Sequence, residues 1–311
     1  MIYKKITCIF CAFLLSLLWT CINSGTAFAD AQILPTNLLT IDANAFYGDS
    51  SLEEIVVPEG METIGEKAFA YSGLKHIYLP ETVSSIAKNA FLGCDGLTIY
   101  CPANSYARSF ADEHSIAWLD ISGYASVIEK YREAYVSGNA NATYNNEAYA
   151  YHNNISPFIG YSAHVGYTYK NLDNDKIPEL IIAGIDAREA YNQELFDIYT
   201  IISGQLKKIA TSYYRSRNYL RSDNTILNTG SNGAGHTIWS LHRLIEGKYQ
   251  TFEAVFYYYD QESQRIGYYY QTENITFYPE DSDIQLDKAT FDAMRDEYES
   301  TVYLPPLIFI A

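Results

Sequence analysis

The chain has 311 residues, of which 48% are hydrophobic and 19% are charged. This balance excludes a wholly disordered chain, and the length is enough for two domains with cores of their own. Acidic residues outnumber basic ones 37 to 21, which gives a net charge of −16. Such a charge excludes nucleic acid and anionic membranes as main partners, because both require a basic footprint. Tyrosine is unusually frequent, with 30 residues against 14 Phe and 3 Trp.

The first 29 residues have the layout of a secretory signal peptide. Lys4 and Lys5 precede the apolar run Ile6–Leu18 and the small-x-small cleavage sequence Ala27–Ala29. The apolar run is shorter than the roughly 20 residues that span a bilayer, so a membrane anchor is the weaker alternative. Lipid modification at Cys21 is another. We therefore expect a secreted or cell-surface protein without a membrane span after cleavage.

Cleavage after Ala29 changes the charge and the cysteine count. The remaining chain has 19 basic and 37 acidic residues, a net charge of −18, and keeps only Cys94 and Cys101. Two cysteines do not make a disulfide framework. We expect two buried thiols that act as small hydrophobic residues, and a disulfide formed in an oxidising compartment is the alternative.

A motif with a period of 22 or 23 residues follows. Each unit begins with Ile-x-x-x-Ala-Phe and closes on a short apolar segment followed by proline. Alternate side chains of that segment share one face of a strand, and proline ends the strand because it has no N–H to donate. Single units cannot bury that face alone, so the pattern predicts a stacked solenoid. The units start at Ile41, Ile64 and Ile86, carry Phe46, Phe69 and Phe91, and end at Pro58, Pro80 and Pro102.

The motif resembles the BspA-type leucine-rich repeats of bacterial surface and secreted proteins over roughly residues 33–119. The resemblance implies a C-terminal cap, with a short helix over Ser105–His114 and a returning strand over Ile116–Leu119. It also implies a binding surface on the concave face. The resulting division is 1–29 signal peptide, 30–119 repeat solenoid with its cap, and 120–311 a domain of unknown function.

The concave face supplies the candidate binding residues. Strand positions between the core residues point to this face and form two columns. Tyrosine offers contact area and a polar tip, so an exposed aromatic pair beside a histidine suits a protein or glycan ligand. An ordinary solenoid face without a ligand is the alternative. One column is Glu54, His76 and Thr98, and the other is Val56, Tyr78 and Tyr100.

The rest of the chain predicts an α+β fold, with a mainly antiparallel sheet and flanking helices. Helical spacing runs from Val127 to Tyr135, and a second helix opens at Asp287. This domain looks like an uncharacterised module of secreted Firmicutes proteins, which implies no activity. The expected strands are 165–170, 180–183, 195–202, 205–210, 225–228, 238–245, 251–259, 266–271 and a terminal strand at 304–311.

A loop that begins at Asn171 alternates oxygen donors and then enters an apolar strand, an arrangement that can wrap Ca²⁺. It resembles the DxDxDGxxD loops of FG-GAP and VCBS calcium-binding β-repeats. The first Asp of that pattern is Asn here, and its Gly is Lys176. An acidic turn whose side chains bond their own backbone is the alternative. The candidate ligands of a structural calcium are Asn171, Asp173, Asp175, the carbonyl of Ile177, and Glu179.

Catalytic signatures such as HExxH and GxSxG do not occur. The glycine-rich segment Gly230–His236 lacks the Lys-Ser/Thr of a phosphate-binding loop, so we expect a hairpin or loop there. We predict a non-enzymatic binding or adhesion protein that recognises an extracellular protein or glycan through its repeats. The alternative is an extracellular hydrolase for carbohydrate or peptide with the repeats as a targeting arm, and a structural spacer is a third interpretation. The oligomeric state stays open.

Overall fold

The structure, a computed structural model, describes residues 32–137, 164–185, 194–212, 215–233, 235–272 and 275–310. The predicted signal peptide lies outside this part of the chain. The chain divides into two compact units, Met1–Ala125 and Ser126–Ala311, because most contacts between residues fall within one unit or the other. Within the described residues nineteen strands stand against three helices, so the chain is mainly β. No helix in those residues is both long and apolar enough to cross a membrane.

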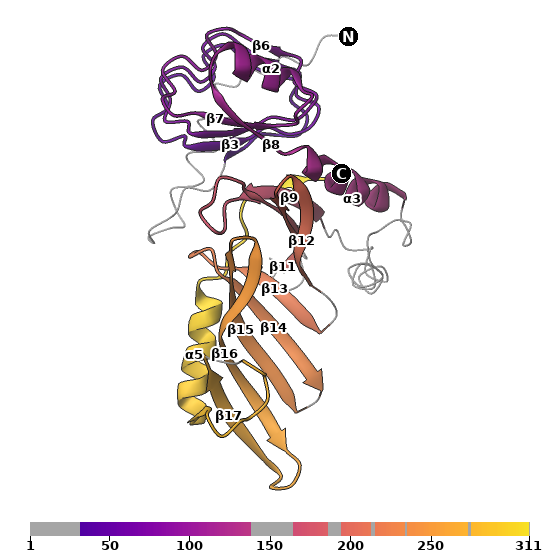
Figure 1. Ribbon diagram of the computed structural model, residues 1–311, viewed down its shortest axis with the longest axis vertical. Helices are drawn as coiled ribbons and strands as arrows, with labels where there is room; N and C mark the ends of the chain where they lie inside the picture. Colours follow the sequence, from indigo (N-terminus) through magenta and orange to yellow (C-terminus); the bar gives the residue numbers. More distant parts are fainter. Residues whose placement is uncertain are drawn as a thin grey trace. The chain divides into compact units, whose positions relative to one another are not determined.

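The first unit is a stack of coils, each with a short strand on either side (Figure 1). Strands of successive coils pair in parallel and in register, so equivalent positions of neighbouring repeats lie side by side. One sheet has the order β1 (Gln32–Ile33), β3 (Glu54–Val56), β5 (His76–Tyr78), β7 (Thr98–Cys101) and β8 (Ala117–Asp120), and the other β2 (Thr40–Ile41), β4 (Thr63–Ile64) and β6 (Ser85–Ile86).

A ladder of phenylalanine rings runs through the core of these coils. Phe46 stacks on Phe69 with 5.2 Å between ring centroids, and Phe69 stacks on Phe91 at 5.4 Å. Helix α2 (Tyr106–Glu113) then closes the stack, because its Phe110 meets Phe91 edge-on at 6.0 Å. Ser105 caps this helix by accepting a hydrogen bond from the backbone N–H of Arg108. The predicted cap is therefore present in the structure.

The second unit is built on one antiparallel sheet of eleven strands. Helix α3 (Ser122–Ser137) contains the boundary between the units, and its Tyr131 donates a hydrogen bond to the buried carboxylate of Asp197. The strands in chain order are β9 (His164–Lys170), β10 (Glu179–Ile185), β11 (Glu194–Ile202), β12 (Gln205–Thr211), β13 (Ser216–Leu220), β14 (Ile226–Gly233), β15 (His236–Ile245), β16 (Lys248–Asp260), β17 (Arg265–Gln271), β18 (Ile284–Leu286) and β19 (Ile308–Phe309).

The predictions for this unit need correction in three respects. The expected terminal strand over 304–311 is only β19, because Pro305 and Pro306 cannot donate to a ladder. Strands β13 and β18 were not predicted. The glycine-rich segment belongs mostly to β14, which continues to Gly233 before the turn into β15.

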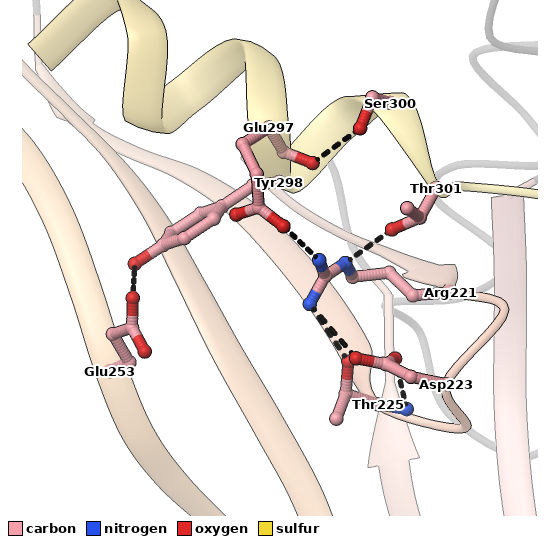
Figure 2. A network of polar contacts seen from close by, with 8 residues as sticks. All are labelled: Arg221, Asp223, Thr225, Glu253, Glu297, Tyr298, Ser300 and Thr301. Carbon is pink, nitrogen blue, oxygen red and sulfur yellow. Dashed lines mark hydrogen bonds and ion pairs between the residues drawn. The ribbon is translucent and has the colours of Figure 1, made fainter.

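Helix α5 (Lys288–Ser300) packs on one face of this sheet, with Phe291 and Tyr298 buried. It begins after its predicted N-cap, Asp287, which accepts from the N–H of Thr290 at 2.8 Å. At its other end the buried guanidinium of Arg221 donates to Glu297 at 2.9 Å and to the hydroxyl of Thr301 at 2.8 Å (Figure 2). These hydrogen bonds join the end of the helix to the sheet.

The phenylalanine ladder gives a stability prediction. Phe69 is fully buried between two rings, so Phe69→Ala should lower the free energy of unfolding of the repeat unit by about 3–5 kcal/mol. Leu92→Ala is the control, because Leu92 is 48% exposed, and it should cost under about 1 kcal/mol. Urea unfolding measures both. Equal losses would contradict a ladder that supports the stack.

Candidate functional site

The two predicted columns on the solenoid differ in exposure. Parallel register aligns Glu54, His76 and Thr98 along one row, and all three are partly exposed. The second row is aligned in the same way, but Tyr78 is only 3% exposed and Tyr100 only 5%. The prediction of an exposed aromatic pair at Tyr78 and Tyr100 is therefore wrong, and Val56 is buried as well.

Stacking between neighbouring coils explains part of this burial. The rings of Tyr78 and Tyr100 stack at 4.7 Å with 13° between their planes, so each ring covers a face of the other. The hydroxyl of Tyr100 lies 3.4 Å from Nδ1 of His76, which joins the two rows. Burial lowers the pKa of His76 below its ordinary value, against the opposing influence of Glu53. The row of Val56, Tyr78 and Tyr100 therefore contributes to packing between coils, and the partly exposed His76 lies beside it in the other row.

The exposed aromatic side chains of the solenoid lie elsewhere. Tyr47 is 52% exposed and Tyr71 55%, and the two rings meet edge-to-face at 5.7 Å. The N–H of Tyr71 donates to the carbonyl of Leu92, whose side chain is also exposed. Tyr47, Tyr71 and Leu92 are thus exposed on successive coils, and we call these three residues the tyrosine ridge. The ridge is not among the predicted binding residues, although an extra tyrosine one or two residues after the buried Phe46 and Phe69 is a usable signal in the sequence.

Gly93 is the local reason for the position of Tyr71. Its φ is +76°, a region that side chains rarely adopt, and a Cβ there would lie 2.6 Å from Cδ1 of Tyr71. The tyrosine ring therefore rests over a glycine of the next coil.

The predicted calcium loop is held by hydrogen bonds within itself. Asp173 Oδ1 accepts from the N–H of Asp175, and Asp175 Oδ1 accepts from the N–H of Ile177. Nδ2 of Asn171 donates to the carbonyl of Asp175. Glu179 is fully buried and accepts from Leu172 N–H at 2.8 Å and from the hydroxyl of Thr200 at 2.9 Å. Burial raises the pKa of Glu179 to about 8, and the nearby Asp173 and Asp175 add to the rise.

The five predicted ligands fit calcium to different degrees. Oδ1 of Asn171 is buried without a hydrogen-bond partner, as expected for an oxygen that a cation would engage. Both oxygens of Glu179, in contrast, are already hydrogen-bonded inside the fold. In the described ranges no three Asp, Glu, His or Cys side chains are placed to hold one ion. Both oxygens of Asp173 also accept hydrogen bonds, from the N–H groups of Asp175 and Gly247. Asn171 therefore fits a calcium ion, Glu179 as arranged does not, and calcium binding stays a prediction.

Cys94 and Cys101 are both free thiols. Cys94 donates to the carbonyl of Phe69 at 3.0 Å, and burial raises the pKa of Cys101 to about 11. A raised pKa keeps a thiol protonated and unreactive at neutral pH. The two cysteines thus fit a structural role in the solenoid core.

A buried serine–histidine pair lies in the second unit and was not predicted. Oγ of Ser240 is 2.8 Å from Nε2 of His242, and the hydroxyl of Thr251 is 3.0 Å from its Nδ1. The imidazole also stacks on Tyr249 at 4.5 Å. Ser240 and His242 are 1% and 7% exposed, which leaves no access for a substrate. Their arrangement matches a core histidine with satisfied hydrogen bonds.

Comparison with known proteins identifies the first unit. A family model described as the BspA type leucine rich repeat region matches residues 25–131 in six copies. This segment is a BspA-type leucine-rich repeat region. The match extends beyond the three motifs and the cap on both sides. Neither the curated proteins nor the solved structures contain a match to the chain. BspA-type repeats are typical of bacterial surface and secreted proteins, and they suggest a protein-binding role.

His242 gives a prediction about pH. Burial lowers its pKa from 6.5 to about 4. Below pH 6.5 the imidazole of His242 takes up a proton in the unfolded chain but not in the folded chain, so the contribution of His242 to the free energy of unfolding should fall between pH 6.5 and 4. The contribution of His242 is about 3 kcal/mol. Urea unfolding across this range should show that the difference in free energy of unfolding between the unmodified chain and His242→Gln changes with pH in this way, because any other titrating group contributes equally to both chains.

The control is Thr251→Val, which removes a hydrogen bond to His242 but keeps the imidazole. It should retain most of the pH dependence. If His242→Gln and Thr251→Val change the slope equally, the titration of His242 is not its cause.

Proposed function

We propose that the chain is an extracellular, non-enzymatic binding protein whose repeat region recognises a protein partner through the tyrosine ridge. The main support is the pair of half-exposed rings of Tyr47 and Tyr71 on successive coils, with exposed Leu92 on the next coil. Tyrosine is enriched among the residues that dominate binding energy at protein interfaces. The family of the repeat region is further support.

The polar row extends the proposal. Glu54, His76 and Thr98 remain partly exposed and are fixed by strand register, so they can supply oriented hydrogen bonds to a partner. Burial of Tyr78 and Tyr100 removes them as contacts but stiffens the strands that carry this row. A glycan ligand is the alternative partner.

The proposal assigns no reaction to the chain. Ser240 and His242 have the spacing of a nucleophile and a base, but the third group is the hydroxyl of Thr251 in place of a carboxylate. Burial of the pair also argues against a hydrolytic role for it.

The binding proposal is tested with a panel of purified extracellular proteins and a glycan array. The variants are Tyr47→Ala and Tyr71→Ala, and the control is Tyr106→Ala, which removes a 44%-exposed tyrosine from the cap. We expect a protein to be bound, and each ridge variant to weaken it about 10–30-fold, with no change for the control. Equal binding by all four chains, or binding to glycans alone, would contradict the proposal.

We also propose that the loop at Asn171 binds a structural calcium ion through Asn171, Asp173, Asp175 and the carbonyl of Ile177. The support is the unpartnered Oδ1 of Asn171 in the same short loop as the carboxylates of Asp173 and Asp175. Extracellular calcium sites commonly have dissociation constants of roughly 0.1–1 mM. Calcium at ten times such a value should stabilise the folded chain by about 1.4 kcal/mol.

Thermal unfolding of the full chain with and without 10 mM calcium, about ten times the upper dissociation constant, tests the site. We expect the melting temperature to rise by a few degrees in calcium and the shift to disappear in Asp173→Asn. Asp281→Asn, which removes an exposed carboxylate elsewhere, should keep the shift. A chain that does not respond to calcium has no functional site in this loop.

A further inference from the structure

The second unit contains a cavity of about 820 Å³ beside helix α5 and strands β15–β17. Its volume lies within the range of small-molecule sites, roughly 300–1,000 Å³. Eight of the residues that line it are aromatic, among them His236, Trp239, Tyr257, Tyr258, Tyr268 and Tyr278. It is separate from the tyrosine ridge, which belongs to the first unit.

Strand register explains how the rings gather here. Tyr257 lies opposite Tyr268, so both point to the face that α5 covers. Trp239 lies on the same face, with 6.3 Å between its ring centroid and that of Tyr257. Phe291 of α5 contacts Tyr268, with 4.9 Å between the two ring centroids. These three rings with Phe291 behind them form one part of the wall, which we call the helix-side subsite.

The cavity also reaches around the end of the β14–β15 hairpin. His236 is three residues before Trp239 on one strand, so its side chain points to the opposite face. On that face the centroid of its imidazole ring lies 5.5 Å from the ring centroid of Tyr258 and 5.2 Å from that of Tyr278, and the Tyr278 side chain is half exposed. We call this second part, made of His236, Tyr258 and Tyr278, the hairpin-end subsite. A ligand that fills both parts must be a chain of several rings.

A buried acceptor points to the chemistry of the ligand. His236 is only 5% exposed, and its Nε2 has no hydrogen-bond partner. Burial lowers the pKa of His236, so the imidazole is neutral near pH 7, and with its proton on Nδ1 the remaining nitrogen, Nε2, is an acceptor. An unsatisfied buried acceptor is costly, and a ligand hydroxyl would satisfy it.

The rim of the cavity carries balanced charge. Lys288 and Arg295 both contact the carboxylate of Asp292, at 2.5 Å and 3.0 Å, and Arg295 also contacts Asp296. Positive charge that is already paired does not favour an anionic ligand over a neutral one. Asp292 is the only carboxylate among the residues that line the cavity, whereas glycoside hydrolysis commonly uses two. The rim thus suits binding of a neutral, hydroxyl-bearing molecule without its cleavage.

We propose that this cavity binds a neutral oligosaccharide, with the rings of Trp239, Tyr257 and Tyr268 stacking on its sugar faces and Nε2 of His236 accepting one hydroxyl. Aromatic faces carry partial negative charge and attract the C–H groups of a sugar ring. Two features hold the helix-side rings in place. The Trp239 indole donates to Glu299 at 2.8 Å, and the Tyr257 hydroxyl accepts from Thr237 at 2.8 Å.

Isothermal titration of the full chain with maltohexaose, cellohexaose, xylohexaose and chitohexaose tests the proposal. We expect at least one of these neutral oligosaccharides to bind. Tyr278→Ala removes an exposed ring and should weaken binding about tenfold, while Tyr278→Phe keeps the ring and should bind like the unmodified chain. His236→Phe keeps an aromatic ring but removes the acceptor, and it should also weaken binding about tenfold.

Tyr106→Ala, on the cap of the repeat region, is the control and should bind like the unmodified chain. The melting temperature of each variant shows that it is folded. The proposal is overturned if no oligosaccharide binds, if every variant binds equally, or if only charged saccharides or peptides bind. This result is independent of the ridge, because Tyr47→Ala should leave oligosaccharide binding unchanged even where it abolishes protein binding.

Discussion

Stacking between neighbouring coils is the interaction on which the repeat unit depends. A coil of 22 residues is too small to bury its own apolar face, so each phenylalanine finds its partner in the next repeat. Phe110 of the cap ends this series by covering Phe91. In-register strands follow from the same stacking, and they place Glu54, His76 and Thr98 in one row. The surface available to a partner is thus a consequence of the core.

The parts of the fold that follow from local pattern could be predicted. Ile-x-x-x-Ala-Phe and the closing prolines define each coil, and the sequence also predicts that α5 opens at Asp287. The burial of Tyr78 and Tyr100 could not be predicted. The alternation of side chains along a strand shows to which face each one points, but not which neighbouring side chains cover that face. Strand β13 could not be predicted because it begins with Ser216, Arg217 and Asn218, none of which is a β-branched or aromatic residue of the kind typical of strands.

The candidate sites show the same limit. The predicted calcium loop is visible in sequence because its oxygen donors alternate along one short segment, but the inward hydrogen bonds of Glu179 depend in part on Thr200 of another strand. The oligosaccharide cavity draws on β15, β16, β17 and α5, whose contacts are long-range. Runs at Tyr257–Tyr259 and Tyr268–Tyr270 indicated an aromatic sheet, but only the register shows which rings share a face.

Tyrosine therefore has two roles in this chain, as packing residue and as exposed contact. Hydroxyl-radical footprinting of the full chain, read by mass spectrometry, tests this division most directly. Tyr47, Tyr71 and Tyr278 should be oxidised rapidly, because each is more than half exposed. Tyr78, Tyr100, Tyr124 and Tyr298 should be protected in the folded chain, because each is at most 5% exposed. Oxidation of Tyr78 and Tyr100 as fast as Tyr47 and Tyr71 would contradict the account.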